Sequence, residues 1–318
     1  ACLRATLESL EQSPSLQSDI WVVDNASSDD SCAMVRQQFP SVHLIPSSEN
    51  LGFAGGNNLA LRSCGFGPGT DSSSADERPD LVLLLNADAE PRGDSLGMMA
   101  RFLLQNQRVG AAGANLHFAD GSFQHGAYAY PGLFQLWYDL FPPRPRRLLE
   151  SSLNGRYPRR LYRGSKPFAV GFALGACLMV RKEAIDTVGL LDEGYFMYSE
   201  ELDLCRRLWS AGWQVHFLPD AVVVHHEGAS SDQVAPRRHR EFQLSRVRYF
   251  AKHHGAVAGF TVKSGVIALY CGEVALEAVK WLAGHRRELR RERIASYVSV
   301  IRALLTGGSR GSECGSAS

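Results

Sequence analysis

The chain has 318 residues, of which 45% are hydrophobic and 21% are charged. This composition is typical of a globular protein and excludes collagen, coiled coil and wholesale disorder. The length allows one large domain with a smaller appendage. The charge is uneven, because residues 1–235 carry 19 Lys and Arg against 27 Asp and Glu, whereas residues 236–302 carry 14 against 5. An acidic body with a basic C-terminal segment suggests that one end of the protein meets an anionic surface.

The seven cysteines predict neither a disulfide framework nor a zinc site. Their number is odd, no two are spaced as Cys-x-x-Cys, and several lie in apolar runs. Free thiols of this kind fit a reducing compartment. We therefore expect a cytoplasmic protein.

Helices and short buried strands are predicted to alternate over the first hundred residues. Leu3, Leu7 and Leu10 lie at the spacing of one helical face, which predicts a helix at the start of the chain. Strands follow at 19–23, 42–45 and 81–85, and helices open near residues 50–58 and 94. This order predicts an α/β fold with a mostly parallel sheet flanked by helices. Ligands bind beyond the carboxyl ends of such strands, where three polar clusters lie.

The second half of the chain changes character twice. Residues 141–167 are rich in Pro, Arg and Tyr and predict an irregular excursion. The chain regains order at the apolar run 172–180, and a helix is expected at about 199–211, ended by Gly212. Two further apolar runs lie at 215–218 and 221–224, the second in the last predicted strand. Beyond Pro236 the pattern is helical and basic. We expect a catalytic domain at 1–235, a helical appendage at 236–306 and a disordered tail at 307–318.

The cluster Asn86-Ala87-Asp88 directly follows the aliphatic run 81–85. An acidic residue at a strand end, two positions from another oxygen donor, suits a hard divalent cation that also binds phosphate oxygens. The alternative is a turn in which Asp88 caps the next helix.

Two further polar segments suit ligand contacts. Asp24 and Asn25 end a strand, and their side chains either hydrogen-bond a base or ribose or close a turn. The glycines between Asn50 and Asn58 let backbone N–H groups approach a ligand, at a helix start that favours anions. The spacing matches neither the dinucleotide-binding fingerprint nor the P-loop.

Glu201 is the candidate catalytic base. On a helix, it lies in the middle of an apolar stripe that includes Cys205 and Leu208, whereas Glu200 and Asp203 fall on the other face and are expected to be solvated. A carboxylate on an inward face is costly unless it is paired or used. The alternative is a structural role, paired with an arginine or capping the helix.

His225 and His226 end the last predicted strand. A neutral imidazole at this place is able to bind a metal ion. A purely structural role is the alternative for an isolated pair of histidines.

Five segments together resemble the family 2 glycosyltransferases of GT-A fold. They are, in order, VVDNASSDDS, NLGFAGGNN, LLLNADAEP, GACLMVRKEAIDTVGLLDEGYFMYSEELDLCRRLWSAGW and VVVHHEGAS. The resemblance covers about residues 3–250 and is nearest to bacterial rhamnosyltransferase-like members that build cell-surface polysaccharide. Each motif alone is weak, but the order and spacing of all five are specific.

The resemblance implies a role for each candidate residue. The residues near the nucleotide-sugar donor are Asp24, Asn25, Asn50, Gly52, Asn57 and Asn86. Asn86-Ala87-Asp88 matches the family's DxD motif with Asn in place of the first acid, so that Asp88 is the metal-binding acid and His225, or His226 in its place, completes the site. Glu200-Glu201 matches an acidic pair, usually Glu-Asp, whose second member is the catalytic base.

The family also implies an inverting transfer assisted by a divalent metal ion, Mg²⁺ or Mn²⁺. The donor is a dTDP- or UDP-sugar, with dTDP-rhamnose the first expectation, and the acceptor is a saccharide or a polyprenyl-linked saccharide. Members of the family begin with a central apolar strand ending near Tyr-Asn, which this sequence does not show. We therefore expect an N-terminally truncated domain, with a gap in the sheet beside the strand at 19–23.

The basic C-terminal segment has two interpretations. Residues 257–283 are apolar but are interrupted by charges, and their longest uncharged run, at 264–272, is too short to span a bilayer. With five arginines following, they predict a helix on the inner membrane surface. The alternative is ordinary helices with a solvated basic face.

Two other classes of function remain open from the sequence. A nucleotidyltransferase has a similar fold and metal, but it needs a basic glycine-rich loop near its start. A non-catalytic protein that binds membrane or nucleic acid through its basic end leaves Glu201 without a purpose. Aromatic residues do not interleave with the basic run, so no nucleic-acid partner is expected.

Overall fold

The computed structural model describes residues 2–13, 18–67, 78–140, 151–226 and 235–307. The chain divides into two compact units, residues 1–196 with 200–230, and residues 197–199 with 231–318. The domain division expected at residue 235 stays a prediction. The expected disordered tail lies outside the described residues, apart from Gly307.

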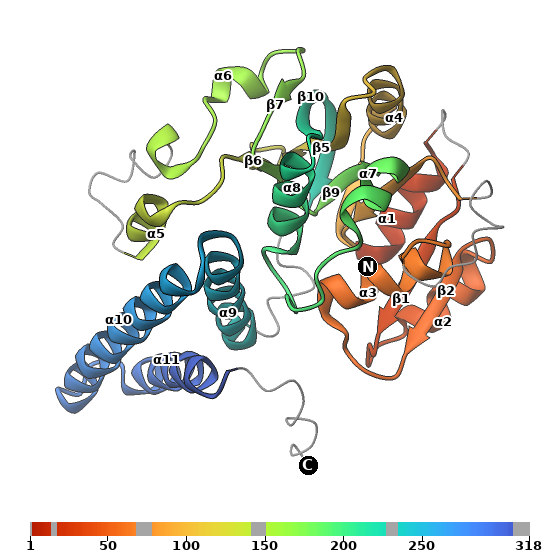
Figure 1. Cartoon of the computed structure of the whole chain (residues 1–318). Helices are drawn as coiled ribbons and strands as arrows, with labels where there is room; N and C mark the ends of the chain where they lie inside the picture. The colour runs from red at the N-terminus through yellow and green to blue at the C-terminus, as the bar shows by residue number, and fades with distance from the viewer. Residues whose placement is uncertain (1, 14–17, 68–77, 141–150, 227–234, 308–318) are drawn as a thin grey trace. The chain divides into compact units, whose positions relative to one another are not determined.

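The first unit is built on a six-stranded mixed sheet flanked by helices (Figure 1). In order across the sheet, the strands are β3 (Leu81–Leu85), β9 (Cys177–Arg181), β5 (Val109–His117), β10 (Gln214–His225) and β4 (Ala89–Pro91), and β7 (Phe168–Ala169) pairs with β10. Of the pairings in this sheet, β5 with β10 is parallel and the others are antiparallel. The prediction of an α/β fold is confirmed, but the expectation of a mostly parallel sheet is wrong.

The direction of β9 explains this difference. All five residues of β9 are buried and its first four are apolar, so the sequence pattern does not alternate and is the same for a parallel and an antiparallel strand. β9 follows β8 (Phe172–Ala173), which pairs with β6 (Ala127–Tyr128), after a turn of three residues. It then inserts between β3 and β5, antiparallel to both.

The two runs expected at 215–218 and 221–224 form one strand, β10, with an irregularity between Leu218 and Val222.

The first two strands form a sheet of their own. β1 (Trp21–Asn25) and β2 (His43–Ser47) are parallel and, among the described residues, pair only with each other. The expected gap beside the strand near 19–23 is therefore present. Helix α1 (Cys2–Glu11) forms where it was predicted, and the Thr6 hydroxyl donates a hydrogen bond of 3.0 Å to the carbonyl of Ala87 in the polar cluster after β3.

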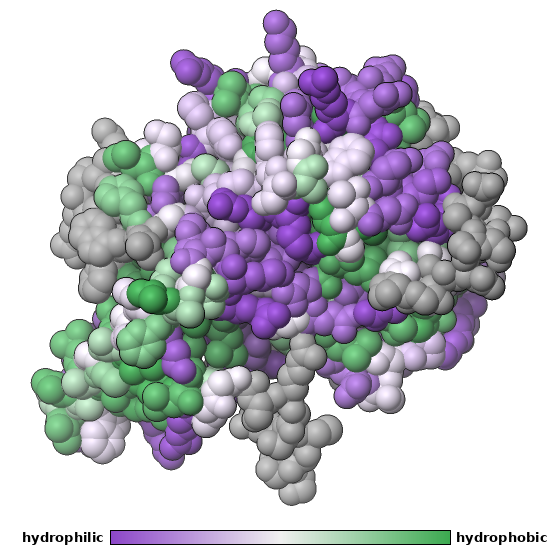
Figure 2. Space-filling view, in the orientation of Figure 1, coloured by the Kyte–Doolittle hydropathy of each residue, from purple (hydrophilic) through white to green (hydrophobic). Residues whose placement is uncertain are grey.

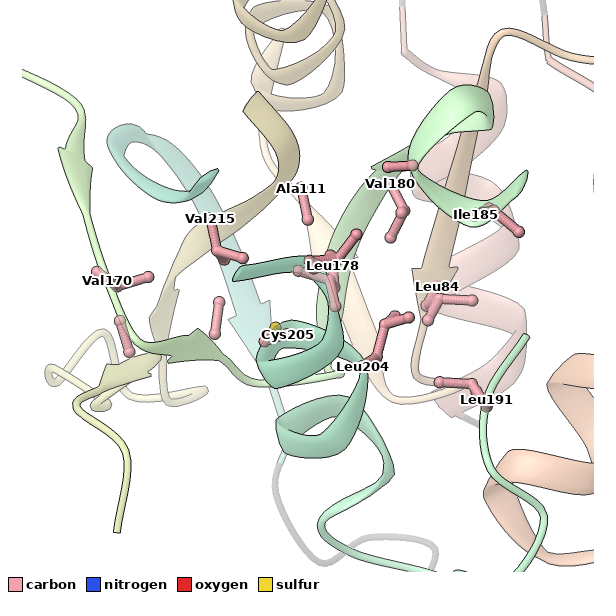
Figure 3. Close-up of a cluster of buried hydrophobic side chains, with 14 of the residues drawn as sticks. Leu84, Ala111, Val170, Leu178, Val180, Ile185, Leu191, Leu204, Cys205 and Val215 are labelled. Atoms are coloured by element: carbon pink, nitrogen blue, oxygen red, sulfur yellow. The ribbon is translucent and has the colours of Figure 1, made fainter. Parts of the chain in front are cut away.

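Each face of the six-stranded sheet is covered by helices. Residues of β9 alternate between the two sides, as the pleat of a strand requires. Leu178 and Val180 pack against α8 (Glu200–Ser210) and α7 (Lys182–Val188) in the cluster drawn in Figure 3. Cys177 and Met179 pack on the other side against α4 (Ser95–Gln105). The smaller β1–β2 sheet shares a cluster with α1 and α2 (Ser31–Gln38). This packing fixes the strand ends that carry the polar clusters.

Helix α3 (Gly52–Ser63) begins at a crowded glycine. Gly52 has a φ of +73°, and an added Cβ would lie 2.1 Å from the carbonyl oxygen of Phe196. Gly189 is a matched position, because its φ is +79° and an added Cβ would meet nothing within 4 Å. We expect Gly189→Ala to cost roughly 1–3 kcal/mol, because its φ of +79° and ψ of −179° lie in a region that essentially only glycine adopts.

Gly52→Ala is expected to lower the free energy of unfolding by more than Gly189→Ala, because the clash with backbone adds to the strain. Urea unfolding of both variants measures the difference. Equal losses would show that the close approach of Phe196 costs nothing.

The second unit is helical. It contains α9 (Ala235–His254), α10 (Ala256–Leu282) and α11 (Arg287–Thr306). The buried residues Val262, Val266 and Tyr270 of α10 form its interior with Val300 and Leu304 of α11. No helix in the described part of the chain is long and apolar enough to cross a membrane.

The first unit also contains α5 (Leu133–Leu140), α6 (Arg159–Tyr162) and the 3₁₀ turn Ser152–Asn154.

Candidate active site

The ends of β3 and β10 bring three predicted site residues together. The side-chain amide of Asn86 lies 3.2 Å from Nε2 of His225, and Oδ1 of Asp88 lies 3.4 Å from the same nitrogen. This contact follows from sheet pairing, because β10 pairs with β4 in a register that sets His225 opposite Ala89. Asp88 and His225 are buried, with 6% and 7% of their surfaces exposed. Asp88 leads into β4, so the alternative in which it caps a helix is wrong.

A fourth residue orients the imidazole. Nδ1 of His225 lies 3.1 Å from Oε1 of Gln124, an oxygen that only accepts hydrogen bonds. Nδ1 therefore carries the proton in the neutral ring, and Nε2 turns its lone pair toward Asn86 and Asp88. His226 does not share this arrangement, since its Nε2 lies 2.8 Å from Oε1 of Glu90.

The donor set suits a cation. A carboxylate oxygen and a ring nitrogen lone pair face each other at 3.4 Å, an arrangement that a shared positive charge stabilises. The contact from Gln124 to the opposite ring nitrogen is the kind of outer partner that metal-binding histidines have. Among the described residues, no three His, Cys, Asp or Glu side chains group as a complete metal site. Asp88 and His225 thus fit a cation whose remaining ligands come from water or substrate.

Glu201 lies beside the loop that supports Asn86. The backbone N–H of Asn86 donates to the carbonyl of Ala176, 3.0 Å away. At the adjacent Gly175, an added Cβ would lie 3.5 Å from Cβ of Glu201 and 3.3 Å from the ring of Phe53. The turn between β8 and β9 therefore contacts the Asn86 cluster on one side and the carboxylate-bearing helix on the other.

Helix α8 buries more acid than its periodicity predicts. Glu201 is half-buried, whereas Glu200 is 4% exposed and Asp203 is fully buried. The expectation that Glu200 and Asp203 are solvated is wrong. The reason is that other elements cover α8 on several sides. The side of the helix that carries Glu200 and Asp203 therefore has little contact with water, although its residues are polar.

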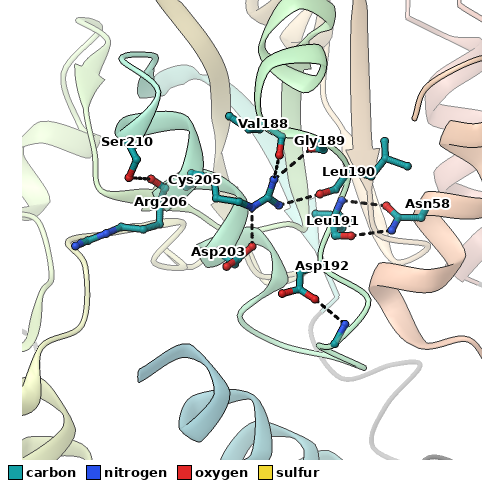
Figure 4. A network of polar contacts seen from close by, with 12 residues as sticks. Asn58, Val188, Gly189, Leu190, Leu191, Asp192, Asp203, Cys205, Arg206 and Ser210 are labelled. Atoms are coloured by element: carbon teal, nitrogen blue, oxygen red, sulfur yellow. Dashed lines mark hydrogen bonds and ion pairs between the residues drawn. The ribbon is translucent and has the colours of Figure 1, made fainter. Parts of the chain in front are cut away.

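Arg207 neutralises Asp203 and closes the preceding turn. Its Nε donates to Oδ2 of Asp203 at 2.8 Å. Its two terminal nitrogens donate to three successive backbone carbonyls at the end of α7, those of Val188, Gly189 and Leu190 (Figure 4). This network attaches α8 to the end of α7 and so fixes the helix that carries Glu201.

Glu200 has no such partner for one of its oxygens. Its Oε2 is buried and, within the described part of the chain, has no hydrogen-bond partner. Burial raises the pKa of the Glu200 carboxyl well above its ordinary value, and the neighbouring Glu201 carboxylate raises it further. Tyr198 and Ser199, both with positive φ, immediately precede the helix. The first turn of α8 thus combines backbone strain with a destabilised carboxylate.

The raised pKa of Glu200 predicts a pH-dependent effect of Glu200→Gln. The folded state holds this proton to a higher pH than the unfolded chain does, so the wild-type contribution is largest at low pH. It is lost as pH rises from the unfolded pKa, about 4.3, through the raised folded pKa.

Relative to wild type, the Gln variant should therefore gain stability between about pH 4 and neutral pH. Urea unfolding at several pH values measures this. Glu183→Gln, at an exposed carboxylate on α7, is the control and should show no such trend. A pH-independent difference for Glu200→Gln would contradict the assignment.

The residues expected near the donor have partners within the chain. Asn25 ties α3 to β1, since its amide donates to the carbonyl of Gly52 at 2.9 Å and its oxygen accepts from the N–H of Leu51 at 3.3 Å. Asn50 accepts from the N–H of Gly52 at 3.0 Å, which caps the start of α3. The structure therefore brings Asn25, Asn50 and Gly52 together at one helix start.

Two further predicted residues make local hydrogen bonds. Asp24 accepts a hydrogen bond of 3.3 Å from the N–H of Ser27. This bond closes the turn that the sequence offers as the alternative to a contact with a base or ribose. Asn57 donates to the carbonyl of Phe53 within α3 at 2.9 Å. Their proposed contacts with a nucleotide stay predictions. Gln124 and Arg207 were not singled out, because their partners become visible only in three dimensions.

Comparison with known proteins decides the family. A family model described as "Glycosyltransferase like family 2" matches residues 1–243. The chain belongs to glycosyltransferase family 2. An N-acetylglucosaminyl-diphospho-decaprenol L-rhamnosyltransferase of Mycobacterium tuberculosis is 31% identical over 231 residues, which cover 72% of this chain and 73% of the relative. Rhamnosyltransferase WbbL of Escherichia coli K12 is 32% identical over 83 residues, covering 26% of this chain and 31% of the relative.

Solved structures confirm the GT-A fold of this glycosyltransferase. A Pyrobaculum calidifontis mannosyltransferase, in complex with GDP-Man and Mn²⁺, aligns with 96% of this chain and 83% of its own at a TM-score of 0.51 and 16% identity. GalNAc-T7, with UDP, GalNAc and Mn²⁺, covers 79% of this chain and 47% of its own at a TM-score of 0.50 and 14% identity. The nucleotidyltransferase and non-catalytic alternatives are set aside by the family match, so the enzyme is a rhamnosyltransferase-like glycosyltransferase.

Proposed function

We propose that this glycosyltransferase moves a sugar, rhamnose in the first instance, from a dTDP- or UDP-linked donor to a polyprenyl-linked saccharide in cell-surface polysaccharide synthesis. The observation that carries the proposal is that the turn at Gly175–Ala176 binds the backbone of Asn86, whose side chain contacts His225, and also packs against Glu201. The relative from Mycobacterium tuberculosis, named for transfer of L-rhamnose to a decaprenol-linked acceptor, supports the substrate classes. Because an acceptor of this kind lies in a bilayer, we propose that the reaction takes place at the cytoplasmic membrane surface.

A divalent cation, Mg²⁺ or Mn²⁺, would be held by Asp88 and His225. Their facing oxygen and nitrogen, with Gln124 behind the ring, are the donors that fit it. When bound, such an ion neutralises the charge that develops on a diphosphate leaving group. Asn86 lies against the same imidazole and would contact the donor as well as orient the ring.

Glu201 would act on the acceptor. Its carboxylate removes the proton of an acceptor hydroxyl as that oxygen bonds to the anomeric carbon. The bond from this carbon to the diphosphate breaks, and its electron pair leaves with the nucleoside diphosphate. Attack opposite the leaving group inverts the anomeric configuration. The buried surroundings of α8 exclude the water that would otherwise hydrolyse the donor.

The start of α3 would face the donor's nucleotide. Asn25 and Asn50 already hold this turn, and Gly52 allows the backbone to pass close by. Asp24 at the end of β1 and Asn57 on α3 would complete the contacts. The N–H groups at a helix start favour the negative charge of a diphosphate.

A donor screen tests the proposed function. The chain is incubated with dTDP-rhamnose, UDP-galactofuranose and other UDP-sugars, with and without Mn²⁺ or Mg²⁺, and release of nucleoside diphosphate is read with a polyprenyl-diphosphate saccharide present. We expect turnover with dTDP-rhamnose that depends on both acceptor and cation. Turnover with no donor of this panel, by a chain that is folded, would overturn the proposal.

Asp88→Asn tests the cation site separately from turnover. The variant keeps the size and the polar contacts of the side chain but removes its charge. We expect Mn²⁺ affinity, measured by calorimetry in the presence of nucleoside diphosphate, to fall at least about tenfold. Asp94→Asn, at the exposed ion pair with Arg101 on α4, is the control and should bind Mn²⁺ like wild type. Unchanged affinity in Asp88→Asn would place the ion elsewhere.

A further inference from the structure

Helix α10 turns its uncharged side to solvent. Its charged residues, Lys263, Glu273, Glu277 and Lys280, are buried or only partly exposed. A helix on the surface of a globular protein normally has the opposite arrangement. Fourteen of its 27 residues are exposed and none of them is charged: Ala256, Val257, Phe260, Thr261, Ser264, Gly265, Ala268, Cys271, Gly272, Ala275, Leu276, Val279, Trp281 and Leu282.

The two sides separate cleanly around the helix axis. At 100° per residue, the exposed residues other than Ala256 and Trp281 fall within an arc of roughly 160°, and the charged residues fall on the opposite side. On the charged side, the buried Glu277 carboxylate pairs within the unit with Arg290 of α11 at 2.7 Å and with Lys280 at 3.0 Å. The buried charge of α10 is therefore neutralised on the side away from the exposed uncharged face.

The exposed face carries large apolar side chains near both ends. Val257 and Phe260 are 82% and 71% exposed at one end, and Val279 and Leu282 are 64% and 70% exposed at the other. Small residues lie between them. Figure 2 shows hydrophobic residues gathered over these C-terminal helices at the lower left. Contiguous exposed apolar surface of this kind marks a site of interaction with a partner or a membrane.

Cations flank this face. Lys252 is exposed just before α10, and Arg286 and Arg287 are exposed just after it. The Arg287 guanidinium lies 5.5 Å from the ring centre of Trp281, an exposed residue near the end of α10 that lies outside the uncharged arc. Carboxylates are absent from the exposed side of α10, all of whose residues are described. The partner that matches an apolar face with cations at its ends has an apolar interior beneath an anionic surface.

We infer that the exposed face of α10 binds an anionic phospholipid bilayer, lying in the plane of the membrane. The helix is about 40 Å long, and its apolar side chains would enter the acyl region while the arginines contact phosphate headgroups. Crossing the bilayer is not required, in agreement with the absence of a membrane-spanning helix among the described residues. This inference goes beyond the transfer reaction and is independent of which sugar is transferred.

Co-sedimentation with lipid vesicles tests the inference. The chain is mixed with vesicles of phosphatidylcholine, with or without phosphatidylglycerol, at low and high salt. We expect binding to the anionic vesicles that weakens with salt, and a loss of roughly fivefold in partitioning for each of Arg286→Ala and Arg287→Ala. The double variant Phe260→Asp/Val279→Asp should lose at least about tenfold.

Leu104→Asp, at an exposed leucine of α4, is the matched control and should bind vesicles like wild type. Circular dichroism checks that each variant keeps its helices. As a second measurement, Phe260→Trp places a tryptophan within the exposed arc, and brominated lipid should quench the fluorescence of this variant more than that of wild type.

Three results would overturn the inference. In the first, the wild-type chain stays in the supernatant with anionic vesicles. In the second, the double Asp variant binds these vesicles as well as wild type does. In the third, wild type forms a dimer and binds no vesicles, and the double Asp variant is a monomer. Donor turnover on a water-soluble acceptor analogue reports the transfer reaction separately. A failure of membrane docking is thereby distinguished from a failure of the proposed activity.

Discussion

Glu201→Gln is expected to abolish most glycosyl transfer while leaving donor binding intact. The amide has the shape of the carboxylate but does not accept a proton from the acceptor hydroxyl. Loss of a general base lowers kcat by roughly 10²- to 10⁴-fold. The measurement is kcat with dTDP-rhamnose and a polyprenyl-linked acceptor, beside a calorimetric Kd for the nucleoside diphosphate.

Two variants make this result specific. Glu201→Asp keeps a carboxylate and restores the Glu-Asp pair of related enzymes, so we expect it to retain more turnover than the Gln variant. Glu183→Gln removes an exposed carboxylate of α7 and should leave kcat unchanged. Full activity in Glu201→Gln would remove Glu201 from the mechanism. A parallel loss of donor binding would instead point to a role in holding the donor.

Arg207→Ala is expected to produce the largest loss of stability. The substitution leaves the Asp203 carboxylate, which is fully buried, without its cation and removes donors from the carbonyls of residues 188–190. Breaking a buried ion pair by removing one partner costs about 3–5 kcal/mol. Urea unfolding, with the slope checked against wild type, measures the loss.

Arg101→Ala provides the comparison on an exposed pair. Arg101 and Asp94 approach to 2.6 Å, compared with 2.8 Å for Arg207 and Asp203, but their side chains are 52% and 31% exposed. Solvent screening limits such a pair to below about 1 kcal/mol. A loss in Arg207→Ala no larger than that in Arg101→Ala would contradict the structural role given to the Asp203–Arg207 network.

The strand ends were predictable because the relevant signals are local. A buried aliphatic run followed by Asn86 and Asp88 identifies a strand and its polar end without reference to the rest of the chain. The same holds for His225 at the end of β10. Their contact was expected from the family resemblance and is explained in the structure by the pairing of β10 with β4.

The environment of α8 was not predictable in the same way. A helical wheel places residues relative to one another, but burial depends on what covers each side. Arg207 hydrogen-bonds both Asp203 and the carbonyls at residues 188–190, so these carbonyls lie against a side of α8 that the helical wheel alone predicts to be solvated. The contact of Gln124 with His225 spans 101 positions in the sequence. The antiparallel direction of β9 is not predictable from the sequence, because a strand that is buried on both faces has the same apolar pattern in either direction.

An anomalous diffraction measurement on crystals grown with Mn²⁺ and nucleoside diphosphate tests the central claim most directly. We expect one manganese peak between the Asp88 carboxylate and Nε2 of His225, with the diphosphate bound to it and the Glu201 carboxylate facing the diphosphate. A manganese ion bound with the diphosphate at any other residues, or a Glu201 carboxylate that faces away from the diphosphate, would contradict this claim.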